Sequence, residues 1–258
     1  MAKFIYNNDK IEKATHPVEY AVGKAAVLGC GYGMGKDKFY GTCISWGIDI
    51  APAVAEAAVA AYRKKYEKVV KFWYATESAA RAAVRTPGSV HSCGGGDLGA
   101  GEKAPNILWG MDKRREFLVA KLPSGRHLRY FRPSLRSIET PYGEKEEIHY
   151  WCAGLGGKLE ENKTYGGSLV ENIVQGVARY IMANGMLNAE KSGFPVILTV
   201  HDELVTEIPT PKDAVGTRGG DAEKTKLAGL IAAMCSLPAW AAGCPIAAEG
   251  WMGKRYRK

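Results

Sequence analysis

The sequence has 258 residues, 46% of them hydrophobic and 24% charged, which is the balance of a soluble globular protein with a buried core. It holds no apolar stretch of membrane-spanning length, no leading signal peptide and no C-x-x-C pair among its six cysteines, so free thiols in a cytoplasmic setting are expected, and a zinc module is not. Thirty-five Lys and Arg against 27 Asp and Glu leave a net charge of +8, which suits a polyanionic partner such as nucleic acid.

The first part of the chain is expected to be mainly helical. A helix is predicted from about Val18 to Leu28, and the alternating glycines of "GCGYGMG" (29–35) are expected to end it. The segment from Pro52 to about Val84 carries apolar residues at three- and four-residue spacing, which predicts helix throughout. The glycine-rich residues 87–106 are expected to form a loop.

Further along, strands and helices are expected in blocks. The segment "FLVAKLPSGRHLRYFRP" (117–133) predicts two strands around a Pro-Ser-Gly turn, and the charged residues 135–167 predict turns. A helix is expected from Ser168, then a hairpin over 196–209, and a last helix from about Asp221. The tail predicts a short strand. This block order favours an α+β fold over a doubly wound parallel sheet.

Three short segments carry side chains suited to chemistry. Lys24, Leu28 and Tyr32 are four residues apart and therefore share one helix face, where a cation and a ring could hold a phosphate and a base. The alternative is a solvated lysine beside a packed tyrosine. The glycines after Tyr32 lack the G-K-[ST] ending of a P-loop.

The second segment is the helix "GGSLVENIVQGVAR" (166–179). Its polar side carries Asn172, Gln175 and Arg179, which could hydrogen-bond the sugars and base edges of a nucleic acid. A merely solvated helix face explains the same pattern.

The third segment is "VHDE" (200–203), at the tip of the expected hairpin, which is predicted to turn tightly and to be buried on one face. A carboxylate held there suits Mg²⁺, which takes hard oxygen ligands. Since neighbouring residues of an extended chain point to opposite sides, Asp202 and Glu203 are not expected to hold one ion together. A metal site would need a further carboxylate from elsewhere.

In this order, the three segments resemble the motifs of family A DNA polymerases, particularly those of phages. "KAAVLGCGYG" (24–33) is similar to the family's fingers-helix pattern K-x3-[F/Y/L]-x3-Y-G, "YGGSLVENIVQGVAR" (165–179) to a palm helix, and "VHDE" to motif C. The resemblance covers nearly the whole chain. It implies a fingers subdomain with an inserted hairpin and loops at 1–164, and a C-terminal palm portion with part of an antiparallel sheet at 165–258.

The resemblance also implies roles in nucleotide binding. Lys24 would contact the phosphates of an incoming dNTP, and Leu28 would pack on its sugar and base. Tyr32 and Gly33 would lie near the templating base.

At the other end of the chain, the resemblance implies a metal and primer site. Asp202 would be one of two aspartates that bind Mg²⁺, and His201, Glu203 and Gln175 would lie around the primer end. The implied reaction is extension of a DNA primer by two-metal nucleotidyl transfer.

The sequence departs from the family pattern in two places. Tyr20 stands where the fingers helix usually has an arginine, four residues before Lys24. Motif A, D-[FY]-S-x-[IL]-E, which supplies the second aspartate, is not found, and neither are thumb and exonuclease regions. We therefore expect a split polymerase, in which a separate chain carries motif A, the thumb and possibly an exonuclease, and in which the isolated chain is inactive.

Two other functions stay open. A non-catalytic DNA-binding or scaffold protein derived from a polymerase would explain Tyr20 and the missing motif A. An unrelated metal-dependent hydrolase built on Asp202 is hard to combine with three ordered motifs.

Overall fold

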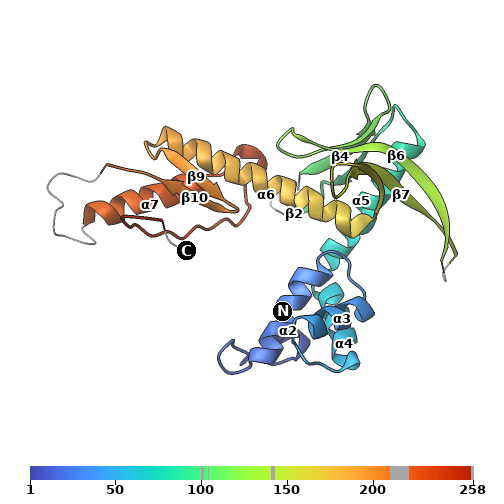
Figure 1. Ribbon diagram of the computed structural model, residues 1–258, viewed down its shortest axis with the longest axis horizontal. Coiled ribbons are helices and arrows are strands. Elements are labelled where there is room, and N and C mark those ends of the chain that lie inside the picture. The colour runs from blue at the N-terminus through green and yellow to red at the C-terminus, as the bar shows by residue number, and fades with distance from the viewer. Residues whose placement is uncertain (100–101, 104, 141–142, 210–220, 257–258) are drawn as a thin grey trace. The chain divides into compact units, whose positions relative to one another are not determined.

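Helices and antiparallel strands occupy separate stretches of the chain, so the predicted α+β class is confirmed. The structure, a computed structural model, describes residues 1–99, 102–103, 105–140, 143–209 and 221–256 (Figure 1). The chain divides into two compact units, unit 1 (residues 1–174) and unit 2 (residues 175–258). Their boundary lies inside one helix, shortly after the predicted one at 164/165. The assignment of the two parts to fingers and palm stays a prediction.

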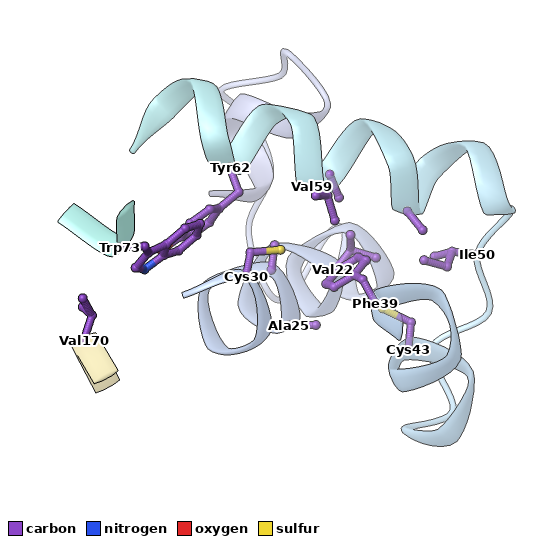
Figure 2. Close-up of a cluster of buried hydrophobic side chains, with 13 residues drawn as sticks. Val22, Ala25, Cys30, Phe39, Cys43, Ile50, Val59, Tyr62, Trp73 and Val170 are labelled. Carbon is purple, nitrogen blue, oxygen red and sulfur yellow. The ribbon is translucent and has the colours of Figure 1, made fainter. Parts of the chain in front are cut away.

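Unit 1 begins with five helices: α1 (Ala2–Ile5), α2 (Pro17–Cys30), α3 (Lys36–Ser45), α4 (Pro52–Lys65) and α5 (Glu67–Arg85). α2, α3 and α4 pack around a shared apolar core (Figure 2). Phe39 and Val22 are fully buried at its centre, and the small residues Ala25, Ala55 and Ala58 let the helices approach closely. α3 was not predicted, because it is only ten residues long and its apolar residues do not form a clear helical repeat.

The helical stretch predicted from Pro52 to Val84 is two helices rather than one. Tyr66 separates α4 from α5 with a non-helical backbone conformation (φ −113°, ψ 45°). The break accompanies aromatic packing, since the Tyr62 and Trp73 rings stack with centroids 6.4 Å apart. The apolar spacing continues through the break, so the pattern did not reveal it.

A six-stranded antiparallel sheet fills residues 90–164, in the order β1-β4-β5-β6-β7-β8. The two strands predicted around the Pro-Ser-Gly turn are present as β5 and β6. The expectations of a loop at 87–106 and of turns at 135–167 were wrong in their described parts, because both contain strands. The strands of this region are β1 (Val90–Gly94), β2 (Asp97–Gly99), β3 (Glu102–Lys103), β4 (Asn106–Met111), β5 (Phe117–Lys121), β6 (His127–Thr140), β7 (Gly143–Ala153) and β8 (Leu159–Thr164).

Cross-strand pairing explains the missed strands. The charged outer half of β7 pairs with β6, from Ile148 opposite Leu135 to Gly143 opposite Thr140, so its polar side chains decorate a long hairpin. Glycines with left-handed backbones, such as Gly94 (φ +90°), end or bend the strands. One face of the sheet packs on α5, where Trp109 and Leu118 are fully buried.

The helix α6 (Gly166–Lys191) begins in unit 1 and continues into unit 2, two residues earlier than predicted from Ser168. Unit 2 further contains β9 (Val196–Val200), β10 (Glu203–Thr206), α7 (Asp221–Cys235) and the short η1 (Ala239–Ala241). The amides of Asn184 and Asn188 both donate to the Ser236 carbonyl, at 2.7 and 3.1 Å, and so satisfy the end of α7.

Two expectations about unit 2 were wrong. The described residues of the tail, up to 256, contain no strand. The hairpin is not buried on one face, since Ile197 is 61% and Leu198 45% exposed, and neighbouring strand residues point to opposite faces. In the described chain, β9 and β10 form a sheet of only two strands. No helix among the described residues is both long and apolar enough to cross a bilayer.

Candidate nucleotide and nucleic-acid site

The outer face of α2 presents the predicted nucleotide-binding residues to solvent. Tyr20, Lys24, Leu28 and Tyr32 follow one another at four-residue spacing, and all four are exposed. Leu28 keeps 47% of its surface accessible, although the opposite side of the same helix is buried. The structure thus places the predicted cation and aliphatic side chain on one exposed face of α2, and leaves the phenol of Tyr32 exposed in the turn that follows the helix.

The glycines after Leu28 end α2 as predicted. The Tyr32 and Gly33 amides donate to Gly29 and Cys30 carbonyls at 3.1 and 2.9 Å, which closes the last turn. Gly33 then adopts a left-handed backbone (φ +76°), a conformation that glycine takes without strain.

The end of α2 lies directly against the start of α6. A Cβ added to Gly167 would come within 2.4 Å of the Tyr32 carbonyl oxygen, and one added to Gly166 within 2.3 Å of the Trp73 carbonyl oxygen. Only glycines fit this approach of three backbones. The two glycines of the "YGG" segment therefore fix Tyr32 and Gly33 relative to the start of α6.

Glu77 of α5 completes this junction. Its buried carboxylate accepts a 3.0 Å hydrogen bond from the Gly166 amide, at the positive end of the α6 dipole. Lys145 lies 3.0 Å from the same carboxylate and Arg81 3.8 Å, so the buried charge is compensated. Nothing in the sequence pattern singled out Glu77, because its partners are distant along the chain.

Of the predicted DNA-binding residues on α6, Asn172 has a protein partner. Its amide donates to the Tyr130 hydroxyl at 3.0 Å. Burial raises the pKa of Tyr130 to about 12, so this hydroxyl stays protonated at neutral pH. Gln175 and Arg179 belong to unit 2 and are exposed.

The acidic tip of the hairpin consists of His201 and Asp202, which connect β9 to β10. Glu203 pairs with Val200, so the loop has only two residues, as predicted for a tight turn. His201 has a left-handed backbone (φ +53°), which the two-residue loops of hairpins require. Both tip side chains are exposed.

Glu203 is held differently from Asp202. Its carboxylate accepts a 3.1 Å hydrogen bond from the hydroxyl of Tyr256, and this bond raises the pKa of the tyrosine. Sequence reasoning missed Tyr256. Among the described residues, no three His, Cys, Asp or Glu side chains are grouped as metal ligands. The predicted Mg²⁺ site at Asp202 stays a prediction.

Comparison with known proteins gives one informative relative. The chain is 34% identical over 241 residues to a DNA polymerase of Bacillus phage SP02, which corresponds to 92% of this chain and 32% of the phage protein. The chain is similar to part of a phage DNA polymerase. The predicted resemblance to a DNA polymerase is thereby confirmed.

The chain spans about a third of the length of this polymerase relative. No family model matches the chain, and no solved structure does. The finer parts of the resemblance, including family A and the roles of single residues, stay predictions.

Proposed function

We propose that this chain is the fingers and C-terminal palm portion of a family A DNA polymerase, and that it extends a DNA primer with dNTPs when a separate polypeptide supplies motif A. The observation that carries the proposal is the exposed α2 face of Lys24 and Leu28, with Tyr32 exposed in the turn after the helix, in a chain similar over 92% of its length to a phage DNA polymerase.

On this proposal, α2 binds the incoming nucleotide. Lys24 lies one turn before Leu28, so its ammonium reaches phosphates while Leu28 packs on the sugar and base. Tyr32 and Gly33 meet the templating base, and the junction with Gly167 holds them in place. Lys24 neutralises phosphate charge and orients the triphosphate, which lowers the barrier by positioning and electrostatics.

The hairpin tip serves the primer end. Asp202 offers an exposed carboxylate on a two-residue turn, a donor that fits Mg²⁺, because this ion is usually bound by one or two carboxylates together with substrate phosphates. Bound Mg²⁺ would stabilise negative charge on the primer oxygen and on the leaving pyrophosphate. His201, Gln175 and Arg179 contact the primer strand, and Glu203 is positioned by Tyr256.

The test is primer extension with Mg²⁺ and dNTPs. We expect no extension by the chain alone, and extension once a polypeptide bearing D-[FY]-S-x-[IL]-E is added. Asp202→Ala should lower the rate of the mixture by about 1,000-fold or more, as expected for loss of a metal ligand in phosphoryl transfer. Lys24→Ala should raise the KM for dNTP.

Matched controls separate these effects from loss of surface charge. Asp9→Ala and Lys71→Ala remove exposed charges elsewhere in the chain and should leave extension unchanged. Extension by the isolated chain would contradict the split arrangement, and full activity of Asp202→Ala in the mixture would contradict the polymerase assignment.

Tyr20 favours a second candidate, a non-catalytic DNA-binding or scaffold protein. An exposed tyrosine in place of the usual arginine removes one phosphate contact from the α2 face. This candidate predicts primer-template binding that is insensitive to Asp202→Ala, together with no extension in the presence of any motif A polypeptide.

A further inference from the structure

Three aromatic side chains form a row across the six-stranded sheet. Phe117 of β5 pairs with Phe131 of β6, which pairs in turn with Trp151 of β7. The first two rings have centroids 5.1 Å apart, and Trp151 is 37% exposed. We call Phe117, Phe131 and Trp151 the aromatic row.

The aromatic row faces away from α5. Side chains alternate along a strand, and the neighbours Leu118 and Tyr130 are the ones buried on the α5 side. Phe117 and Phe131 are only half-buried. The sheet thus buries one face in the protein and presents a second face with aromatic residues on the three adjacent strands β5, β6 and β7.

Cations accompany the aromatic row. The Arg129 guanidinium lies 6.0 Å from the Phe117 centroid, and that of Arg132 lies 5.0 Å from the Phe131 centroid. Lys121 extends the same side of β5 and is exposed. Arg132 has a left-handed backbone (φ +45°) at an irregularity between Phe131 and Ser134, and its amide donates to the Glu116 carbonyl at 2.7 Å.

The carboxylates near the row are compensated. Glu161, which pairs with Trp151 across the strands, forms an ion pair with Arg136, and Glu147 forms one with Lys163 at 3.3 Å. By contrast, no ion pair within 4 Å reaches Lys121, Arg129 or Arg132 from any part of the chain that the structure describes. The β5–β6 part of this face therefore carries a local excess of positive charge.

A short turn holds the beginning of the row. The Asp112 carboxylate accepts hydrogen bonds from the Phe117 and Glu116 amides at 2.9 and 2.7 Å. These amides, chiefly that of Phe117, and the nearby Arg129 lower the pKa of Asp112, so the carboxylate stays ionised at neutral pH. The turn thereby fixes the start of β5 and the position of Phe117, its first residue.

We propose that the aromatic row is a second nucleic-acid site, which binds single-stranded DNA. Bases stack on the rings of Phe117, Phe131 and Trp151, and Arg129, Arg132 and Lys121 contact the phosphates. Adjacent strands lie about 4.8 Å apart, so the row extends over about 10 Å, a scale on which sheet-based binding modules stack two or three bases.

Charge favours DNA over a protein as the occupant. A protein docking face would bury its charges as pairs, whereas this face combines rings with exposed cations that no described carboxylate approaches within 4 Å, the combination that tracks a sugar–phosphate backbone while stacking its bases. The site shares no residue with the α2 face or the hairpin tip, so it does not depend on nucleotidyl transfer.

The direct test is binding of a fluorescein-labelled oligodeoxythymidylate of about 12 nucleotides, within the range of known single-strand sites. It is measured by anisotropy without Mg²⁺ or dNTP, on the full chain carrying Lys24→Ala and Asp202→Ala. Each of Phe117→Leu, Phe131→Leu and Trp151→Leu keeps apolar volume but removes the ring. Each should weaken binding by about tenfold, as expected for loss of one stacked base.

Arginine variants test the phosphate contacts. Arg129→Gln and Arg132→Gln should each reduce the slope of log affinity against log salt by about 0.7, the value for single strands. The matched control is Tyr74→Leu, which removes a ring that is 69% exposed on α5 and should leave affinity unchanged. Far-UV circular dichroism verifies that each variant is folded.

Cross-linking locates the strand independently. A bromodeoxyuridine oligonucleotide should cross-link to peptides that contain Phe131 or Trp151. Cross-links confined to residues 17–33 or 196–206, or unchanged affinity in all three leucine variants, would overturn the proposal. So would the absence of binding in the starting chain, whether or not a protein partner is found for this face.

Discussion

The two segments that most resemble polymerase motifs, α2 and the β9–β10 hairpin, are supported in opposite ways. α2 buries Val22, Ala26 and Cys30 almost completely and exposes the residues proposed to bind nucleotide on its other side. The hairpin leaves Ile197 and Leu198 exposed on both of its faces. One motif is built on a closed core, and the other on a two-stranded ribbon.

This difference indicates what each half of the proposed site requires. The α2 face is positioned by contacts within unit 1, including the approach of Gly167 to Tyr32, and so it is organised before any ligand binds. A two-stranded hairpin gains little stability by itself. We infer that the Asp202 tip becomes fixed only when another strand or chain covers the hairpin, as the proposed partner would.

The largest effect is expected in the core beneath α2. Phe39→Ala removes a ring with no exposed surface and should lower the free energy of unfolding by about 3–5 kcal/mol. Urea denaturation followed by circular dichroism measures the change, and Tyr74→Ala, at an exposed aromatic position, serves as the control and should cost less than about 0.5 kcal/mol. Equal costs would mean that α2 has no specific core.

Next comes the junction between α2 and α6. Gly167→Ala places a methyl group against the Tyr32 carbonyl and should destabilise the chain by about 1–3 kcal/mol, because backbone has to move. Gly41→Ala is the matched control within α3, where a Cβ meets nothing within 4 Å; it should instead stabilise by up to about 1 kcal/mol.

The two glycine substitutions are expected to change the free energy of unfolding in opposite directions, so the comparison between them is a clear test. If Gly167→Ala is as harmless as Gly41→Ala, Tyr32 is not held by the start of α6, and the contrast between a preorganised α2 and an open hairpin fails. Nucleotide affinity should fall together with stability in Gly167→Ala alone.

The sequence predicted α2, the hairpin and the last helix, because each combines a clear period with a clear end signal. Gly29–Gly35 ended α2, and the residues His201–Asp202 interrupted an apolar run. The resemblance placed the proposed site residues, and the structure exposes most of them. The local pattern sufficed wherever a segment's structure depends on its own residues.

Prediction failed where distant residues decide. The strands at 143–164 contain many charges, and they form because β7 pairs with β6 and β8 pairs with β7. No alternation of polar and apolar residues in this segment indicates these pairings. The break at Tyr66 accompanies the stacking of Trp73 on Tyr62, which the apolar spacing does not indicate. Glu77 stayed invisible because its role depends on Gly166, which lies far away in the sequence.

Alkaline pH should weaken the α2 core in particular. Burial raises the pKa of Cys30 from 9.0 to about 11. Below pH 9 the thiol is protonated in both states; between pH 9 and about 11 it ionises only when unfolded, so the stability is lost as pH rises through this window. The loss approaches about 3 kcal/mol, because each pKa unit corresponds to roughly 1.4 kcal/mol.

Substitutions test whether Cys30 causes this loss of stability at alkaline pH. Cys30→Ala should flatten the decline that begins near pH 9, whereas Tyr130→Phe should flatten only the part above pH 10, the ordinary pKa of a tyrosine. Urea midpoints measured at several pH values give the slopes. A decline unaffected by Cys30→Ala would show that the thiol beneath α2 titrates as an exposed one does.

The smallest effect is expected at the hairpin. Ile197→Thr keeps the branched shape and the strand preference while adding a hydroxyl, and at a side chain 61% exposed it should change the free energy of unfolding by less than about 0.5 kcal/mol. The same change at Ile173, which is buried on α6, should cost about 2 kcal/mol, because the hydroxyl loses water without gaining a partner.

Adding the motif A polypeptide should make the substitution at Ile197 costly, whereas the cost at Ile173 should stay as it is in the free chain. If β9 becomes covered in the complex, Ile197→Thr weakens association although it leaves the free chain unchanged, and titration of the labelled partner measures the difference. A cost at Ile197 equal to that at Ile173 in the free chain would mean that the hairpin is already covered, and that Asp202 needs no second chain to hold it.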